Sequence, residues 1–291
     1  MSALIKAMSV GYPIGQLVFF RSSMALIPLL IWLAYLRHLS DAITTKRPLN
    51  HLKRGVIGST GMFCGFAALS YIPLPDAVAI SYATPLLVVV LAALVLGETV
   101  RIYRWSAVGI GIIGVALMLS PHLSPTRIAD MTQGGPSVGA LLALCGALCS
   151  AAATIEVRRL TETETTGAIV FYFMMLTALL GLSTALFGWN MPKTAFDWGA
   201  LISIGILGGI GQITMTQSYR YADASLIAPF EYTQMIWAVA LGWFVFGDFP
   251  VPIVLVGAGV VIAAGLFVLF REQQLGLLKS KVREAAPTLS K

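Results

Sequence analysis

The sequence of 291 residues is poor in charge: Asp, Glu, Lys and Arg together supply 11% of it, against roughly 25% in soluble domains. This scarcity excludes a soluble globular protein, and no polar stretch is long enough to fold as a separate domain. Cysteine is also rare, with three residues in all. Cys145 and Cys149 are one helical turn apart within apolar sequence, so we expect them to pack against other helices rather than to form a disulfide framework.

Sequence motifs that carry enzyme chemistry are missing as well. The sequence contains no HExxH, no GxSxG, no Cys/His spacing typical of a metal site, and no GxxxxGK followed by Ser or Thr. The histidines, His38, His51 and His122, fall in predicted loops near no convincing partner. We therefore predict no catalytic residues, no metal site and no cofactor. A membrane-embedded enzyme is the disfavoured alternative.

Long apolar runs are what the sequence has in abundance. Hydrophobic residues make up 57% of the chain, and the mean hydropathy is +0.84. A helix of about 20 apolar residues crosses a bilayer, and such segments recur along the whole length. The predicted spans are 14–36, 54–72, 75–97, 104–121, 137–157, 167–189, 198–219, 223–247 and 250–271. The sequence thus predicts an all-α, multi-pass membrane protein.

Lysine and arginine gather in alternate connections between these spans. The connections on one side contain Arg37, Lys46, Arg47, Lys53, Arg54, Arg101, Arg104, Arg158, Arg159, Arg220, Arg271, Lys279, Lys281, Arg283 and Lys291. The other side holds only Arg127 and Lys193. Because basic loops stay in the cytoplasm, we expect this side, with the C-terminus, to be cytoplasmic in a cell inner membrane. The asymmetry accounts for the net charge of +6 without a nucleic-acid partner.

The chain repeats itself at a constant shift of 150 residues. The matched pairs are Gly55 and Gly205, Gly58 and Gly208, Gly61 and Gly211, Tyr71 and Tyr221, Tyr82 and Tyr232, Gly97 and Gly247, Glu98 and Asp248, and Gly109 and Gly259. By the charge pattern, 54–72 and 198–219 cross in opposite directions. The repeat is therefore inverted, as is typical of secondary transporters. Coincidence in glycine-rich sequence is the alternative.

An inverted repeat needs an odd number of helices in each unit. The second unit, 137–271, has five predicted helices, whereas the first, 1–121, has four complete ones preceded by the short apolar stretch 1–13. We expect this stretch to be the remainder of a fifth helix in a chain that starts late. A nine-helix protein with an external N-terminus is the alternative. Residues 272–291 are expected to form a charged cytoplasmic tail.

Several runs of sequence carry a resemblance to a known family. YIPLPDAVAISYATPLLVVVLAALVLGE, from Tyr71 to Glu98, is similar to the first-half signature of the EamA branch of the drug/metabolite transporter superfamily. The run from Tyr219 to Pro250 resembles the second-half signature, and MSALIKAMSVGYPIGQLVFFRS resembles the junction between the first two helices. The resemblance implies a bundle of ten helices in two inverted five-helix repeats that transports a small organic solute. The shortened first helix departs from the family pattern.

The resemblance also suggests classes of substrate. Similar members of the branch include riboflavin and S-adenosylmethionine uptake proteins and amino-acid exporters. Both signatures look nearest to the riboflavin-like members, so riboflavin-like vitamin uptake is the favoured hypothesis. Transport of S-adenosylmethionine, amino acids or drugs is the alternative. The sequence leaves open the direction of transport, the choice between proton coupling and facilitated diffusion, and whether the protein forms a homodimer.

Arg21 is a charge inside an apolar run, GQLVFFRSSMA. It lies about seven residues into its predicted helix, roughly 10 Å from the outer end. Charged groups at such depth are costly and are candidates for function, but an arginine can also snorkel to the interface. Binding an anionic part of a substrate, pairing with Glu231, and snorkelling all stay open.

Polar residues recur on equivalent faces of the two signature helices. Glu231 and Gln234 of the second unit correspond to Ser81 and Thr84 of the first. We expect these residues to line a cavity between the halves; a helix–helix hydrogen bond that only holds the bundle together is the alternative. Pro85 is predicted to kink its helix close to these positions.

Further residues complete the predicted pathway for a substrate. Gln212 and Thr216 are one turn apart and would form a polar stripe on their helix. Tyr82, Tyr232 and Trp237 offer flat faces on which a planar ring can stack.

The remaining charged residues are interpreted as structural. Lys6 is expected to snorkel from the end of its short helix. Glu98 and Asp248 follow a glycine at a helix end and are read as caps or loop charges. Asp76 lies near the start of its helix, where an acid stabilises the helix dipole.

Overall fold

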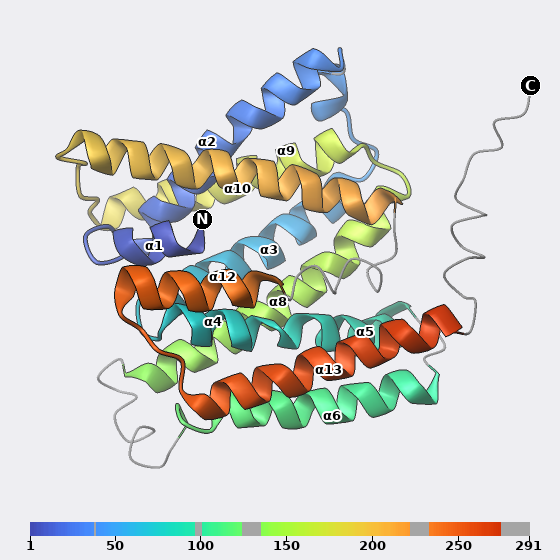
Figure 1. Ribbon diagram of the computed structural model, residues 1–291. Coiled ribbons are helices and arrows are strands. Elements are labelled where there is room, and N and C mark those ends of the chain that lie inside the picture. Colours follow the sequence, from blue (N-terminus) through green and yellow to red (C-terminus); the bar gives the residue numbers. More distant parts are fainter. Residues whose placement is uncertain (38, 97–100, 124–134, 222–232, 275–291) are drawn as a thin grey trace, which may run out of the picture.

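The structure is a computed structural model that describes residues 1–37, 39–96, 101–123, 135–221 and 233–274, and these residues form helices and no strands. The helices are α1 (Ser2–Met8), α2 (Ile14–Tyr35), η1 (Leu39–Ala42), α3 (Pro48–Leu69), α4 (Leu74–Ser81), α5 (Ala83–Leu96), α6 (Ile102–Leu119), α8 (Pro136–Thr161), α9 (Thr166–Ser183), η3 (Thr184–Phe187), α10 (Ala195–Tyr221), α12 (Thr233–Leu241), η4 (Gly242–Phe246) and α13 (Pro252–Gln274). They lie roughly along one direction as a bundle (Figure 1). The predicted all-α fold is confirmed.

Local sequence explains where several helices begin and end. α3 and α8 begin at Pro48 and Pro136, because proline at the first helical position lacks an N–H that would be unpaired anyway. The hydroxyl of Thr165 accepts a hydrogen bond from the backbone N–H of Ala168 at 3.1 Å and caps α9. At the other end of the chain, Gly247 adopts φ 68° and ends the π-helical turn η4.

The predicted span 75–97 is divided into α4 and α5 at Tyr82. Pro85 has no backbone N–H to donate to the carbonyl of Ser81, four residues earlier. The helix is interrupted at that point, which confirms the predicted kink. The matching span in the second unit, predicted over 223–247, is described only from Thr233 onward, as α12 followed by η4.

Seven helical segments among the described residues are long and apolar enough to cross a membrane. These segments are Ile14–Tyr35, Leu74–Val95, Ile102–Leu119, Pro136–Thr161, Thr166–Phe187, Ala195–Ser218 and Pro252–Arg271. α3 is less apolar because Lys53 and Arg54 lie in its first turns, and the apolar segment Thr233–Phe246 is shorter. Many large apolar side chains are exposed around the bundle, where lipid would cover them. The protein is therefore a membrane protein.

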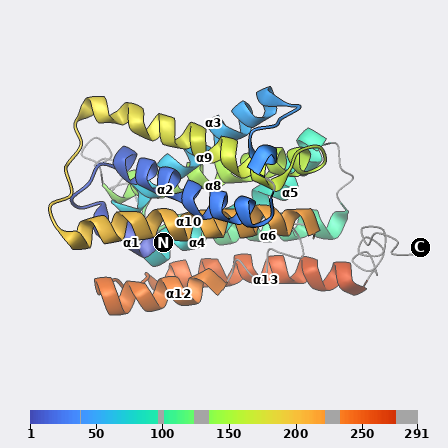
Figure 2. The ribbon, with the colours of Figure 1, turned by 90° about the horizontal axis from the view of Figure 1, so that it is seen from above.

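The two units pack so that equivalent helices lie against each other. α2 packs on α9 and α6 packs on α13, and α4 packs on α12, which belongs to the span that matches α4 and α5 together. Contacts between non-equivalent helices also come in matched pairs. α3 of the first unit packs on α9 of the second, and their counterparts α10 and α2 pack on each other in the same way. Viewed from above, α12 and α13 form a layer along one side of the bundle, with α9 on the opposite side (Figure 2). The packing of matching helices of the two units on each other is what a two-fold axis between inverted repeats produces.

α6 and α13 show the inverted relationship in detail. A Cβ atom on Gly114 would lie 2.8 Å from the carbonyl oxygen of Gly257, and one on Gly257 would lie 2.6 Å from the carbonyl oxygen of Gly114. Gly257 also faces Met118, whereas Gly114 faces Val261. Higher residue numbers on α6 therefore face lower residue numbers on α13. The two helices run antiparallel, and their backbones are in contact at these glycines.

The helices α2 and α9 repeat at a shift of 152 residues, two more than the shift that relates the later helices. Ile14–Tyr35 then falls on Thr166–Phe187, and GQLVFF of α2 falls on GAIVFY of α9. Packing agrees with this register: Gly205 of α10 would meet Met24 of α2, and its counterpart Gly55 of α3 would meet Leu176 of α9. The counterpart of Arg21 is therefore Phe173.

Candidate functional site

The side chain of Arg21 points from α2 into the interior of the bundle, and the residue is 5% exposed. Its Nη1 donates to Sδ of Met174 at 3.2 Å, and its Nη2 donates to Oε1 of Gln212 at 3.4 Å. Met174 belongs to α9 and Gln212 to α10. A charge of the first unit therefore contacts two helices of the second.

The direction of the Arg21 side chain separates it from a snorkelling residue. Arg21 lies two turns into α2, whereas Met174 and Phe173 lie about two turns into α9. Because equivalent helices of the two units run in opposite directions, these two starts are at opposite faces of the bundle. The Arg21 side chain therefore reaches toward the middle of the bundle rather than toward the nearer face.

A second arginine, Arg54 of α3, lies against the same aromatic ring. Cζ of Arg54 is 3.9 Å from the centroid of the Phe173 ring, and Cζ of Arg21 is 5.9 Å from that centroid. Arg54 is 6% exposed. A guanidinium over an aromatic face gains about 0.5–2 kcal/mol, while the two neighbouring positive charges repel each other. In the sequence, Arg54 counts only as one of the basic residues between two predicted spans. The signal that points to a further role is its position four residues before Gly58, a glycine of the repeat.

Each of these arginines occupies space left by a missing side chain. A Cβ atom on Gly208 of α10 would lie 2.9 Å from Nε of Arg21. One on Gly58 of α3 would overlap Nη1 of Arg54 and lie 2.9 Å from Cε2 of Phe173. Gly58 and Gly208 are a matched pair of the repeat. The same position in both units thus makes room for a guanidinium group.

Polar groups continue from Arg21 along α10. Nε2 of Gln212 donates to Oγ1 of Thr216 at 3.3 Å, and Thr216 is 1% exposed. Nearby on the helices that hold Arg54 and Phe173, the hydroxyl groups of Ser59 and Thr177 are 2.7 Å apart and buried. The structure therefore brings Arg21, Gln212 and Thr216, all predicted site residues, into one connected cluster.

The predicted residues around the break between α4 and α5 lie elsewhere. Oγ of Ser81 donates to the carbonyl of Val78 at 2.6 Å, within its own helix. Oγ1 of Thr84 donates to the carbonyl of Ala147 on α8 at 3.3 Å. Tyr82 is 2% exposed and packs in the apolar core. These hydrogen bonds join polar side chains to backbone carbonyls and do not extend to Arg21.

The predicted residues of the second signature are placed only in part. Glu231 and Tyr232 lie outside the described residues. Gln234 is exposed, and Trp237 is 67% exposed, on the outer surface of α12. The structure does not bring these two side chains to the arginine cluster.

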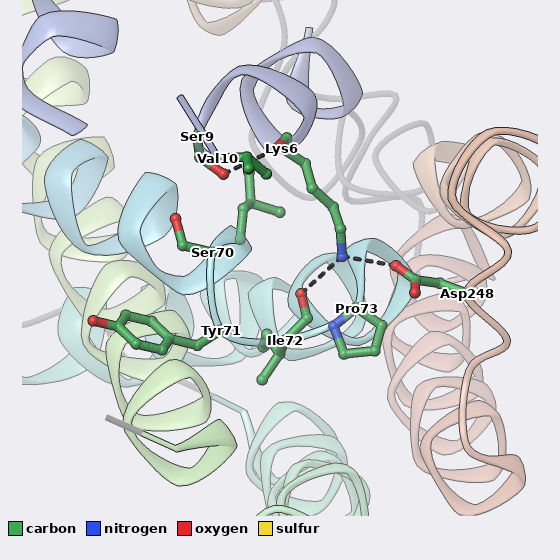
Figure 3. Close-up of a pocket in the computed structure, with 9 residues that line it drawn as sticks. Lys6, Ser9, Val10, Ser70, Tyr71, Ile72, Pro73 and Asp248 are labelled. Atoms are coloured by element: carbon green, nitrogen blue, oxygen red, sulfur yellow. Dashed lines mark hydrogen bonds and ion pairs between the residues drawn. The ribbon is translucent and has the colours of Figure 1, made fainter. Parts of the chain in front are cut away.

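A pocket of about 270 Å³ opens at the end of the bundle opposite the basic loops. Its lining comprises Lys6, Ser9, Val10, Leu69, Ser70, Tyr71, Ile72, Pro73 and Asp248. Nζ of Lys6 lies 2.7 Å from Oδ2 of Asp248 and donates to the carbonyl of Ile72 at 3.1 Å (Figure 3). The structural interpretation of Lys6 and Asp248 needs correction: they form an ion pair that ties α1 of the first unit to the segment after η4 of the second.

His122 was expected to lack a partner, and this expectation is wrong. Its Nε2 lies 3.1 Å from Oδ2 of Asp76, and the two residues are 3% and 0% exposed. Asp76 therefore has a specific partner, in addition to its place in the first turn of α4. The pair joins the start of α4 to the segment after α6, within the first unit.

His51 also has a partner, at the basic end of the bundle. Its Nε2 lies 3.7 Å from Oε2 of Glu164, while Oε1 of Glu164 accepts hydrogen bonds from the backbone N–H groups of Lys46 at 2.8 Å and Arg47 at 3.0 Å. Burial lowers the pKa of His51 despite the neighbouring carboxylate. Burial also acts to raise the pKa of Glu164, but the hydrogen bonds from Lys46, Thr45 and Arg47 and the His51 charge outweigh it and lower that pKa. His38, the third histidine, lies outside the described residues.

The chain matches a family of known proteins over most of its length. Residues 1–120 and 137–270 match the family described as EamA-like transporter family. Among curated proteins, a pseudopaline exporter, CntI, of Pseudomonas aeruginosa is 29% identical over 91% of this chain and 89% of the exporter. An S-adenosylmethionine uptake transporter of Rickettsia prowazekii is 27% identical over 88% of this chain and 82% of its own. A riboflavin transporter of Rhizobium johnstonii is 28% identical over 92% and 84%.

A solved structure shares the fold. A protein known from a crystal structure matches with a TM-score of 0.65 at 18% identity, and the match covers 94% of this chain and 96% of the other. At this identity the likeness concerns the arrangement of the helices alone.

Proposed function

The chain belongs to the EamA-like transporter family, and from this premise we propose that it is a secondary transporter that carries a small organic metabolite across the cell inner membrane. Membership of the family makes it a transporter rather than an enzyme. One observation carries the proposal: Arg21 of the first unit is buried against Met174 and Gln212 of the second. A site between two inverted repeats becomes accessible from either face when one repeat rocks against the other.

The orientation in the membrane is part of the proposal. The basic connections lie in the cytoplasm, together with the C-terminus, because lysine and arginine are retained on that side. The pocket at Lys6 and Asp248 then faces away from the cytoplasm. In this orientation α2 enters from the outer face and α9 from the inner one, and Arg21 and Phe173 approach each other between them.

Two candidate substrates are supported by named relatives. Riboflavin-like vitamin uptake is supported by the resemblance of both signatures and by a relative named a riboflavin transporter. S-adenosylmethionine uptake is supported by a relative of similar identity. A further relative is named an exporter, so the direction of transport is to be measured and not assumed.

The experiment that tests the function uses a riboflavin-auxotrophic bacterium that expresses the full chain. Uptake of labelled riboflavin and of labelled S-adenosylmethionine is measured against cells with an empty vector, and export is measured from cells loaded with each label. Transport of either compound above the control supports the proposal. A rate equal to the control for both compounds, in both directions, removes both named substrates, and a screen of a wider mixture of metabolites then decides whether the protein is a transporter.

A further inference from the structure

We propose that Arg21 and Arg54, together with Gln212, form a binding site for an oxyanion, namely a carboxylate or phosphate group of the transported metabolite. The inference rests on the proposed transport function and names the class of substrate. It applies to the middle of the bundle, where helices of both units meet around Phe173.

The first argument is the electrostatic state of Arg21. Among the described residues no carboxylate forms an ion pair with it; its hydrogen-bond partners there are a thioether sulfur and an amide oxygen. Its Nε has no hydrogen-bond acceptor in the same part of the chain. A buried charge that is not matched by an opposite one is strongly destabilising, and in membrane helices such charges are found where substrates or ions pass. An oxyanion would supply both the missing charge and the missing acceptor.

The second argument is that a further positive charge is held close by. The guanidinium groups of Arg21 and Arg54 lie against one ring, Phe173, so each makes the burial of the other less favourable. A fixed pair of guanidinium groups, each with a planar set of donors, matches the oxygen atoms of a carboxylate or a phosphate. The repeat maintains the pair, because Gly58 and Gly208 are equivalent and each leaves the space that an arginine occupies.

The third argument is that the donors come from both units. Arg21 and Arg54 belong to the first unit and Gln212 to the second. An oxyanion held by all three would bind most tightly in the conformation that brings the units together. A ligand shifts a conformational equilibrium only by its difference in affinity between the two states. The proposed site therefore gives a substrate a direct way to drive the rocking motion.

Matched pairs of compounds test the proposal on the full chain in proteoliposomes. Riboflavin is compared with riboflavin 5′-phosphate, and S-adenosylmethionine with its decarboxylated form; each pair differs in one oxyanion. A defined mixture of acidic, neutral and basic metabolites is screened in parallel, and uptake is measured by mass spectrometry. We expect the member with the oxyanion to be transported, or to compete for transport, roughly tenfold better than its partner. The phosphate and carboxylate arms show which oxyanion the site takes.

Variants then tie the preference to the two arginines. Arg21→Gln and Arg54→Gln should lose roughly tenfold in transport of the oxyanion compound while any transport of its partner is retained. Arg271→Gln, at the exposed end of α13, removes one positive charge elsewhere and should behave like the wild type. If an arginine variant does not fold, the preference can be measured on the wild-type protein alone. Each compound of a pair is added in turn, and the compound that binds more tightly raises Tm further.

The outcomes separate this inference from the proposed function. If riboflavin is transported as fast as riboflavin 5′-phosphate, or if only neutral metabolites are transported, the proposed oxyanion site is wrong. The proposed transport function is not affected by that result. Arginine variants that keep the wild-type preference overturn the oxyanion site as well. If every compound of the mixture enters the proteoliposomes no faster than it enters protein-free liposomes, the result counts against the transport function itself.

Discussion

The ammonium nitrogen of Lys6 lies 2.7 Å from Oδ2 of Asp248, so the two repeats are joined by an ion pair at the face opposite the basic loops. The same nitrogen donates to the carbonyl of Ile72, at the turn that connects α3 to α4. Three segments that are far apart in the sequence, those of Lys6, Ile72 and Asp248, are thus held together beside a pocket. We expect this ion pair to hold the two repeats closed against each other at this end of the bundle.

Lys6→Gln should therefore loosen this end of the bundle. A partly exposed ion pair contributes about 0.2–1 kcal/mol, which corresponds to a change of up to roughly fivefold in the ratio of open to closed forms. Ile72 is 2% exposed, so a cysteine introduced there reports opening through its reaction with a membrane-impermeant maleimide in a background without the native cysteines. The rate should rise in Lys6→Gln and return in the double variant Lys6→Asp with Asp248→Lys. Lys193→Gln, an exposed charge on the same face, is the control, and an unchanged rate in Lys6→Gln would contradict the closing role.

Gly58→Ala should displace Arg54 from Phe173. The added methyl group would overlap Nη1 of Arg54 and lie 2.9 Å from the Phe173 ring, so the guanidinium must move out of its present position. We expect transport to fall roughly tenfold, the effect of weakening one charged hydrogen bond to a substrate. Gly65→Ala on the same helix is the control, because a Cβ there meets nothing within 4 Å. Equal transport rates of the two variants would show that the Arg54 position does not matter.

Much of the fold follows from sequence because lipid imposes a simple rule on each segment. Apolar runs must be helical, since no water pairs with their backbone groups, and the interruption at Pro85 follows from the missing N–H. The matched glycines predicted the inverted repeat, which the antiparallel contact of Gly114 with Gly257 bears out. The relation between α2 and α9 was harder to detect because its shift differs by two residues and Arg21 falls on Phe173.

The candidate site was less predictable because it depends on pairs that are far apart in the chain. Arg21 stood out as a charge in an apolar run, but nothing local shows that it reaches Gln212, 191 positions later. Arg54 and Lys6 lie near the ends of helices, where a charge is ordinary. The partner of His51, Glu164, lies in the loop between α8 and α9, and the partner of His122, Asp76, lies in the first turn of α4, and the packing of the helices sets both approaches. Such pairs are visible only once the helices have been placed.

Gly114→Ala should destabilise the protein by separating α6 from α13. Its Cβ would lie 2.8 Å from a backbone oxygen of Gly257, and backbone cannot turn aside as a side chain can. Overpacking of this kind costs about 1–3 kcal/mol, so Tm in detergent should fall by several degrees, as judged from the usual scaling. Gly109→Ala, whose Cβ meets nothing within 4 Å, should raise the helix propensity by about 1 kcal/mol and leave Tm equal or higher. A Tm for Gly114→Ala equal to that of Gly109→Ala would show that the two helices can separate without cost.

The stability of the basic end of the bundle should depend on pH through Glu164 and His51. The pKa of Glu164 is lower in the folded protein than its usual value of 4.5, so its contribution is complete above that pH and is lost as the pH falls through the folded pKa. The pKa of His51 is lowered from 6.5, so the folded protein favours the neutral ring, and this contribution too is lost on acidification. Tm should therefore fall between pH 7 and pH 4.

Glu164→Gln tests this dependence, because the amide cannot act as the ionised acceptor for the N–H groups of Lys46 and Arg47. At pH 7 the variant should be less stable than the wild type by about 1–3 kcal/mol, the cost of weakening charged hydrogen bonds. The difference in Tm should begin to shrink as the pH falls below 4.5 and should be lost below the lowered pKa of folded Glu164, where the wild-type carboxyl group is protonated in both the folded and the unfolded protein. Glu162→Gln, two residues earlier and exposed, should follow the wild-type curve. A constant difference in Tm across this pH range would mean that the Glu164 charge does not hold the segment of Lys46 and Arg47 in place.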